Sequence, residues 1–430
     1  MTSLGEVTTA SFETGIDYAR KLDAIDPLAG FRERFEIPPA PDGHDGAYLC
    51  GNSLGLMPRR AKELICEELE DWARLGVEGH RNSTRPWYSY HEIFTETGAR
   101  LVGAKPGEVV MMNSLTVNLH LLMVSFYRPD GARRKVLIED GAFPSDTYAV
   151  KTHLRARGID PDDALVLCAP RAGEETLRIE DIEAMIDDLG EELALVMFGG
   201  VHFRTGQFHD LARITKAAHD VGAMAGFDLA HAAGNVMLQL HDWNVDFACW
   251  CSYKYLNSGP GALAGAFVHE RHGDDGSIPR FAGWWGNDPD SRFQMQLIPE
   301  FVPQKGAAGW QLSNPPILAA APLVASLELF DEAGMSALCA KSRALTGYLE
   351  YLLRESMPET CSVITPSSTS ERGCQLSIHV TDQPRRRFDA LMEHGIICDF
   401  REPDVIRLAP TPLYNRFIDV HAAATVLGEG

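Results

Sequence analysis

Short apolar segments alternate with helix-like segments between residues 100 and 270. Runs such as RKVLIED, DALVLCAP and LALVMFGG are almost continuously apolar, as expected of strands buried on both faces. Between these runs the apolar residues recur at helical spacing. In RIEDIEAMIDDLGEE they form one stripe, made of Ile179, Ile182, Met185, Ile186 and Leu189. The alternation predicts an α/β fold with a mostly parallel sheet covered by helices on both faces.

The pattern also predicts where each element lies. Strands are expected within 108–116, which ends in a loop, and within 134–140, 163–170, 193–200 and 223–231. Helices are expected within 117–127, 145–158, 178–192 and 210–222. In sheets of this kind, ligands bind at the carboxyl ends of the strands. Asp228 and Lys254 both fall near such predicted ends.

The pattern changes after residue 315. Long helices are expected over 315–355, followed by a strand in CQLSIHVT, a helix around RRFDALMEHG and further strands in IICDF and VIRLAP. This arrangement is typical of a smaller α+β domain. We therefore predict an N-terminal arm over 1–50 that is part of the small domain, a large domain over 51–315 and a small C-terminal domain over 316–430.

Charge and cysteine content exclude several classes of protein. The net charge of −21 disfavours nucleic acid as a partner, because phosphate binding needs a basic surface. The nine cysteines include no CxxC pair, so we expect no metal site of the zinc-ribbon type and no metal ligand elsewhere. The chain shows neither a signal peptide nor an apolar run long enough for a membrane span. We expect a cytoplasmic protein with no membrane partner.

Lys254 stands at the end of an apolar segment, in SYKYLNSGPG. An unpaired ammonium is costly to bury, so the side chain either reaches water or forms a covalent bond with a carbonyl cofactor. Pyridoxal 5′-phosphate would need a carboxylate at its ring nitrogen, a flat group against its ring and donors for its phosphate. Asp228, His231 or Phe143, and the segment NSLTVN could supply these. Each also has a simpler reading as a turn, cap or core residue.

Longer blocks of sequence carry a more specific signal. The segment FDLAHAAGNVMLQLHDWNVDFACWCSYKYLNSGPGALAGAFVHERH closely resembles the kynureninase family, and so do GNSLGLMP, NSLTVNLHLLMVSFY, AFPSDTYA, GGVHFRTGQ, GWWGND, QLSNPPIL and VIRLAPTPLYN. These blocks span nearly the whole chain in the expected order. The resemblance implies a pyridoxal 5′-phosphate (PLP) enzyme of fold type I, with the cofactor in the large domain. It also implies a homodimer with shared active sites, acting in tryptophan catabolism and NAD biosynthesis.

The resemblance assigns the cofactor contacts residue by residue. Lys254 would bind PLP covalently, and Asp228, helped by Asp146, would pair with the pyridine nitrogen. The remaining contacts would come from Leu115, Thr116 and Tyr253 at the phosphate, Phe143 on the ring, His231 beside it, and Trp284 and Asn314 of the second subunit.

The resemblance also implies a reaction, the hydrolytic cleavage of a Cβ–Cγ bond that releases alanine and an aromatic acid. Arg407 would clamp the α-carboxylate of the amino acid substrate, and Lys254, Asp228 and Tyr253 would be the catalytic residues. For Tyr253, proton transfer and phosphate binding remain open alternatives. Ser53, His80 and Asn314 match family members that prefer 3-hydroxykynurenine. Gly199 stands where relatives often have serine, so we expect one phosphate donor fewer.

Other protein classes remain as alternatives. A cysteine desulfurase or class V aminotransferase would keep the cofactor, but such relatives commonly have histidine before the lysine, where this chain has Tyr253. A desulfurase would also need an exposed nucleophilic thiol, for which Cys361 and Cys374 are the candidates. A non-enzymatic regulator with this fold would typically carry a DNA-binding head, and the acidic first 50 residues offer none.

Overall fold

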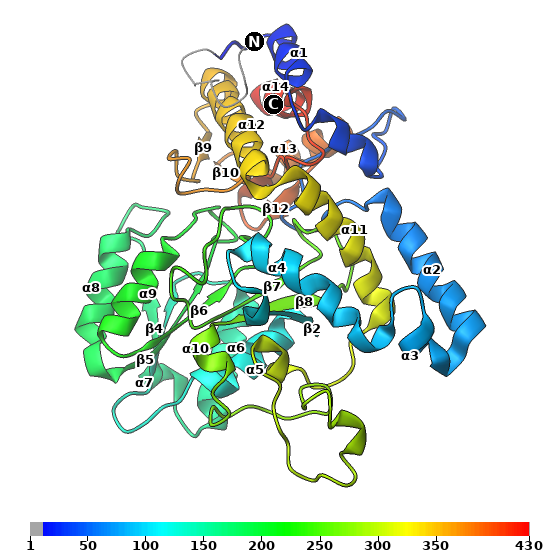
Figure 1. Ribbon diagram of the computed structural model, residues 1–430. Helices are drawn as coiled ribbons and strands as arrows, with labels where there is room; N and C mark the ends of the chain where they lie inside the picture. The colour runs from blue at the N-terminus through cyan, green and yellow to red at the C-terminus, as the bar shows by residue number, and fades with distance from the viewer. Residues whose placement is uncertain (1–11, 430) are drawn as a thin grey trace.

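A seven-stranded sheet forms the centre of the molecule (Figure 1). The structure, a computed structural model, describes residues 12–429. The strand order is β2-β8-β7-β6-β5-β3-β4. The strands are β2 (Val109–Met112), β3 (Lys135–Glu139), β4 (Leu165–Cys168), β5 (Leu193–Gly199), β6 (Met224–Asp228), β7 (Phe247–Cys251) and β8 (Ala264–Val268).

The predicted mostly parallel sheet is confirmed. β3 pairs with β4 and β5, β5 with β6, and β6 with β7, all in parallel. β8 runs antiparallel to both of its neighbours. It begins within a glycine-rich segment that the sequence favours as a turn. Gly265 belongs in the strand because a Cβ there would lie 2.1 Å from the Trp250 ring, which packs across it.

Helices cover both faces of this sheet because the strand residues alternate between two apolar cores. Along β3, Val136 and Ile138 face one core, and Leu137 faces the other. The first core is covered by α5 (Leu115–Phe126), α6 (Pro144–Ala156) and α7 (Pro161–Ala164). The second is covered by α4 (Thr95–Val102), α8 (Ile179–Leu189), α9 (Leu211–Asp220) and α11 (Ile317–Ala333).

A second, smaller α+β unit lies at the top of Figure 1. Its antiparallel sheet has the order β12-β13-β10-β9. The strands are β9 (Cys361–Val363), β10 (Leu376–Val380), β12 (Asp399–Arg401) and β13 (Val405–Leu408), and β1 (Ala47–Tyr48) pairs separately with β11 (Ile396–Ile397). The helices are α1 (Ile16–Ala24), α12 (Met335–Ser356), α13 (Pro384–Glu393) and α14 (Phe417–Glu429).

The N-terminal segment shares the core of this smaller unit. Phe12, Ala19 and Leu22 pack in one apolar cluster with residues of α12 and α14. α1 and α14 lie side by side at the top of Figure 1. The predicted domain boundaries at residues 50 and 315 remain predictions.

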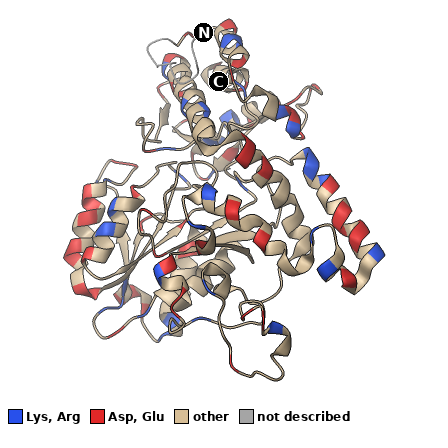
Figure 2. Cartoon of the chain, viewed as in Figure 1, with Lys and Arg blue, Asp and Glu red and all other residues tan. Residues whose placement is uncertain are grey.

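The outer helices carry much of the negative charge. Figure 2 shows acidic residues along α8 and along α2 (Arg59–Leu75), which packs against α11 near the short α3 (Gly79–Asn82). In α8 the sequence IEDIEAMIDDL buries Ile182 and Ile186 and leaves Glu180, Asp187 and Asp188 exposed. Within residues 12–429, no helix has both the length and the apolar content needed to cross a bilayer.

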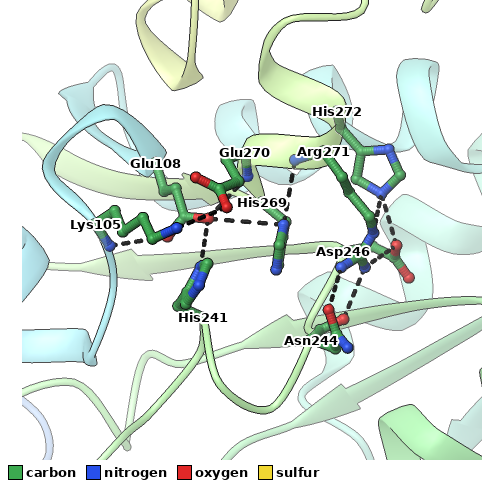
Figure 3. A network of polar contacts seen from close by, with 9 residues as sticks. All are labelled: Lys105, Glu108, His241, Asn244, Asp246, His269, Glu270, Arg271 and His272. Atoms are coloured by element: carbon green, nitrogen blue, oxygen red, sulfur yellow. Dashed lines mark hydrogen bonds and ion pairs between the residues drawn. The ribbon is translucent and has the colours of Figure 1, made fainter.

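Two buried carboxylates tie together the edge where β2 and β7 begin (Figure 3). Glu108 accepts hydrogen bonds from His241 Nδ1 at 2.9 Å and from the backbone N–H groups of Lys105 and Glu270 at 2.8 Å. Asp246 accepts from His219, His272, Arg271 and the backbone N–H of Ala225, at 2.5–2.8 Å. Both carboxylates are thus saturated and hold α10 (Glu270–Gly273) against the sheet.

Glu108, His241 and His269 each offer one atom that could bind a metal ion, and these atoms lie within 4.8 Å of one another. Two features explain the cluster without a metal. The two imidazole rings stack at 4.9 Å with an interplanar angle of 22°, so their nitrogen lone pairs run nearly parallel instead of converging. His241 Nδ1 donates to Glu108, and His269 Nδ1 accepts from the backbone N–H of Arg271 at 3.2 Å. The cluster is a hydrogen-bonded cap of α10.

Candidate active site

The predicted catalytic residues meet at the carboxyl-end edge of the sheet. Asp228 is the last residue of β6, and Lys254 follows β7 in a turn. β5 ends at Gly199 and β3 ends at Glu139. Because these strands are parallel, all four ends lie on one side of the sheet.

One cavity at this edge contains every cofactor contact that the sequence assigns to this subunit. It is lined by Leu115, Thr116, Glu139, Phe143, Ser145, Asp146, Gly199, Val201, Phe203, Asp228, Ala230, His231, Tyr253 and Lys254. Of these, Glu139, Ser145, Val201, Phe203 and Ala230 were not predicted. Glu139 could have been found as an acidic residue ending a buried strand, and Ser145 from its position in the first turn of a helix that begins at Pro144.

Lys254 points into this cavity and meets a neutral partner. Its Nζ lies 2.9 Å from His231 Nε2 and 5.8 Å from the centroid of the Phe143 ring. His231 is buried, and burial together with the positive charge of Lys254 holds the pKa of its imidazole well below the usual value. A neutral imidazole can accept a hydrogen bond from Nζ and so hold the lysine side chain in place.

The acidic side of the cavity has one acceptor without a partner among the described residues. Asp228 Oδ1 accepts from the backbone N–H of Ala230 at 2.7 Å, and burial raises the pKa of Asp228. Burial and the adjacent Asp228 raise the pKa of Asp146 well above the usual value. Asp146 Oδ1 has no hydrogen-bond partner among the described residues. A protonated ring nitrogen between these carboxylates would supply the missing donor and charge.

The opposite side of the cavity can take an anion. α5 begins beside it, and its N-cap residue, Ser114, makes no side-chain hydrogen bond to the first-turn N–H groups. Those N–H groups and the positive end of the helix dipole suit a phosphate. Thr116 Oγ1 lies 3.2 Å from Ser145 Oγ, which adds two hydroxyl donors. A cofactor with a phosphate, a basic ring nitrogen and an aldehyde therefore fits the residues present.

The side chain of Glu139 explains why residue 199 is a glycine. Its backbone N–H donates to both Glu139 oxygens, at 3.0 and 3.1 Å, and burial raises the pKa of Glu139 to about 8. A Cβ at position 199 would lie 2.8 Å from Glu139 Oε1. In the sheet register Gly199 stands beside Asp228, so a serine here would approach the carboxylates. The glycine makes room for Glu139.

Five predicted residues do not line the cavity. His80 packs edge-on against Trp87 at 5.4 Å, Trp284 packs against Trp285 at 4.8 Å, and Asn314 is exposed. Ser53 belongs to a turn bonded to the lysine loop, where the Gly55 N–H donates to the carbonyl of Tyr253 at 2.8 Å. Arg407 lies behind the cavity wall and donates to the carbonyl of Phe203 at 2.6 Å.

Known proteins match the chain over nearly its whole length. Residues 338–427 match the family model of the kynureninase C-terminal domain. A kynureninase from Myxococcus xanthus is 59% identical over 411 residues, which cover 95% of this chain and 96% of that protein. A kynureninase from Koribacter versatilis is 53% identical over 415 residues, covering 96% and 97%. The chain belongs to the kynureninase family. This confirms the family resemblance and PLP as the cofactor.

Solved structures confirm the fold class. The cysteine desulfurase CsdA from Escherichia coli matches with a TM-score of 0.74 at 17% identity, covering 94% of this chain and 98% of that one. The cystine C–S lyase C-DES, solved with its product cysteine persulfide, matches with a TM-score of 0.72 at 18% identity, covering 89% and 97%. Both likenesses show the fold of the PLP fold type I enzymes and nothing finer.

The two thiols considered for the desulfurase alternative are buried. Cys361 and Cys374 have 7% and 1% of their surface exposed. Burial also raises the pKa of Cys374 to about 12, so its thiol stays protonated at neutral pH. A persulfide-forming cysteine must be reachable by the substrate, and neither of these two residues is.

Proposed function

We propose that this member of the kynureninase family hydrolyses the Cβ–Cγ bond of 3-hydroxykynurenine and releases 3-hydroxyanthranilate and L-alanine. One observation supports this most strongly. The cavity places the Lys254 Nζ beside a neutral imidazole, with the carboxylates of Asp146 and Asp228 at the same site and Asp146 Oδ1 without a hydrogen-bond partner among the described residues. This pairing of an amine with acceptors for a ring nitrogen suits covalent PLP chemistry.

Lys254 has two tasks in this proposal. Its Nζ would hold the cofactor covalently, and as a free amine it would take the proton from the substrate Cα. His231, 2.9 Å away, accepts a hydrogen bond from Nζ and helps keep it in place. PLP, when bound, supplies the electron-withdrawing ring that stabilises the negative charge left on Cα.

Asp228 and Asp146 keep the ring nitrogen protonated, since a shared proton relieves the repulsion between two buried carboxylates. Burial raises the pKa of Tyr253, so this phenol keeps its proton at neutral pH and can donate it. We assign to Tyr253 the proton transfer that accompanies water addition at the γ-carbonyl and loss of the aromatic acid. A Y253F variant with unchanged kcat would leave this residue only the phosphate contact.

The substrate-binding residues come from both subunits of a homodimer. Arg407 binds the α-carboxylate, and Ser53 lies on the turn beside Lys254. Trp284 and Asn314 do not line this subunit's cavity, which supports their assignment to the site of a second copy, and His80 would join them around the substrate ring. An imidazole and an amide there would hydrogen-bond a ring hydroxyl, and such a site discriminates strongly against a substrate that lacks it.

The activity and its preference are tested together. Purified protein is incubated with kynurenine and with 3-hydroxykynurenine, and alanine and both aromatic acids are quantified. We expect kcat/KM to favour the hydroxylated substrate, and H80F or N314V to reduce that ratio about tenfold or more. H394F, at an exposed histidine, is the matched control. No alanine from either substrate would contradict the function, and an unchanged ratio in both variants would contradict the preference.

Shared sites are tested by mixing K254A, which lacks the catalytic lysine, with N314V, which is impaired towards 3-hydroxykynurenine. K254A and N314V damage different halves of one shared site, so a mixed dimer regains one intact site. An equal mixture that exchanges subunits should recover about a quarter of wild-type activity. Light scattering checks that the sample is dimeric. No recovery despite demonstrated exchange would place Asn314 in the site of its own subunit.

A further inference from the structure

Arg407, the proposed α-carboxylate ligand, is itself held by a carboxylate. Asp399 on β12 stands directly opposite Arg407 on β13 in the antiparallel register. Arg407 Nε donates to Asp399 Oδ1 at 3.0 Å, and Arg407 Nη2 lies 2.7 Å from Asp399 Oδ2. This is a side-on, two-point contact of the kind that fixes the plane of a guanidinium.

The pair is enclosed, and it retains a positive charge. Arg407 is fully buried, and 10% of the Asp399 side chain is exposed. A second guanidinium, that of Arg401, also contacts Asp399, with Nε 3.0 Å from Oδ1. Two cations around one carboxylate leave one positive charge uncompensated, and this is the charge that a substrate carboxylate would neutralise.

The remaining donors of Arg407 lie toward the cavity wall. Its Nη1 donates to the carbonyl of Phe203 at 2.6 Å, and Phe203 lines the cavity. Each terminal nitrogen carries two N–H groups. Asp399 occupies the Nε and Nη2 side, so one N–H on each terminal nitrogen is left for another acceptor.

We propose that Asp399 is a positioning residue for substrate recognition: it occupies the Nε side of Arg407 and presents the terminal nitrogens to the α-carboxylate. This inference rests on the proposed function, in which Arg407 binds that group. Without Asp399, repulsion from Arg401 and the loss of one hydrogen bond and one ion-pair contact would let the long side chain turn away from the substrate.

The test compares two ligands on the holoenzyme. L-alanine carries an α-carboxylate and ethylamine does not, and each is titrated while the absorbance of the bound cofactor is followed. In D399N we expect the Kd of L-alanine to rise about tenfold or more, because a charge-assisted two-point contact is lost. The Kd of ethylamine should stay within about twofold. In turnover, KM should rise while kcat changes little.

The control and the second variant address folding. D404N alters an aspartate of the same unit whose partner is His379, at 3.2 Å, and it should leave both ligands unaffected. D399E keeps the charge but displaces the carboxylate, and it should show the same selective loss if D399N does not fold. R407A tests the underlying assignment in parallel.

The outcomes separate the two claims. If R407A binds L-alanine normally, the role of Arg407 in the proposed function is wrong. If R407A weakens L-alanine but neither Asp399 variant does, only the positioning role is wrong. An equal loss for both ligands would show a general structural defect and overturn the inference. Tighter L-alanine binding in D399N would show that Asp399 competes with the substrate, and it would overturn the inference as well.

Discussion

Buried carboxylates lie at both edges of the large sheet, and the two groups differ in their hydrogen bonds and in the direction of their pKa shifts. At the edge where β2 and β7 begin, Glu108 and Asp246 are saturated with hydrogen bonds (Figure 3). Burial alone would raise the pKa of Asp246, but the hydrogen bonds from His219 and His272 outweigh it and lower that pKa below the usual value. At the edge where the strands end, burial raises the pKa values of Asp146, Asp228 and Glu139.

The difference separates a structural from a functional use of the same chemical group. A buried carboxylate with its full set of donors stabilises the fold. A buried carboxylate without them destabilises the empty protein, and that deficit is relieved when a ligand supplies a donor. Substitutions at the two edges should therefore act on different observables.

The largest effect is expected for D228N. An amide cannot hold the ring nitrogen in its protonated state, so kcat/KM should fall about a thousandfold or more. The unfolding free energy should stay the same or increase, since a buried and poorly compensated charge is removed. Activity assays and urea unfolding measure the two quantities. A variant that lost stability and activity in proportion would show that Asp228 is structural.

The D246N variant should lose stability and keep its activity. Removing this carboxylate leaves Arg271 and the histidines around it without their counter-ion, so the unfolding free energy should fall by about 3 kcal/mol. The kcat of the folded fraction should remain unchanged. Since the folded-state pKa of Asp246 is lowered, its stabilising contribution is present above the unfolded pKa of about 4 and is lost at lower pH. Wild-type stability should therefore fall more steeply in acid than that of D246N.

The E139Q variant tests the difference between the two edges through the pH dependence of stability. The pKa of Glu139 is raised to about 8, so its contribution to stability declines as pH rises from about 4.3 through that value. Glutamine carries no such proton. Urea unfolding of the cofactor-free protein at about pH 6 and about pH 9 should show the variant gaining roughly 2 kcal/mol on the wild type over that range. A constant difference between the two proteins would mean that Glu139 is already ionised at pH 6.

H241Q should have the smallest effect. Glu108 keeps its backbone donors, Lys105 and Glu270, so the loss of one hydrogen bond should lower stability by about 1 kcal/mol. Activity should not change. Isothermal titration with Zn²⁺ provides a second readout. Tight, stoichiometric binding to the wild type that H241Q abolishes would contradict the assignment of this cluster as a cap.

Much of the fold follows from the local pattern. The apolar run at 134–140 became β3, and the stripe through Ile182 and Ile186 became the buried face of α8. β8 was not predicted because its alanine and glycine residues have little strand propensity, and the strand exists because Trp250 packs over Gly265. That contact depends on tertiary structure.

Site residues could be predicted only where they lie in segments that resemble the kynureninase family. Lys254, Asp228 and His231 were found in this way, and the cavity brings them together. Glu139 was missed because its contact with Gly199 exists only when β3 lies beside β5. The same holds for Asp399, which meets Arg407 through the register between β12 and β13. The local hydrophobic periodicity of a sequence does not predict which strands pair or in which register.

The covalent link at Lys254 is the central claim, and its chemical capture is the most direct test. Borohydride reduces a bond between an amine and the cofactor aldehyde to a stable form, and peptide mapping then locates it. The account predicts a single modified peptide, with the cofactor attached at Lys254, and no modification in K254A. A tag on another lysine, or none at all in protein that carries the cofactor, would contradict it.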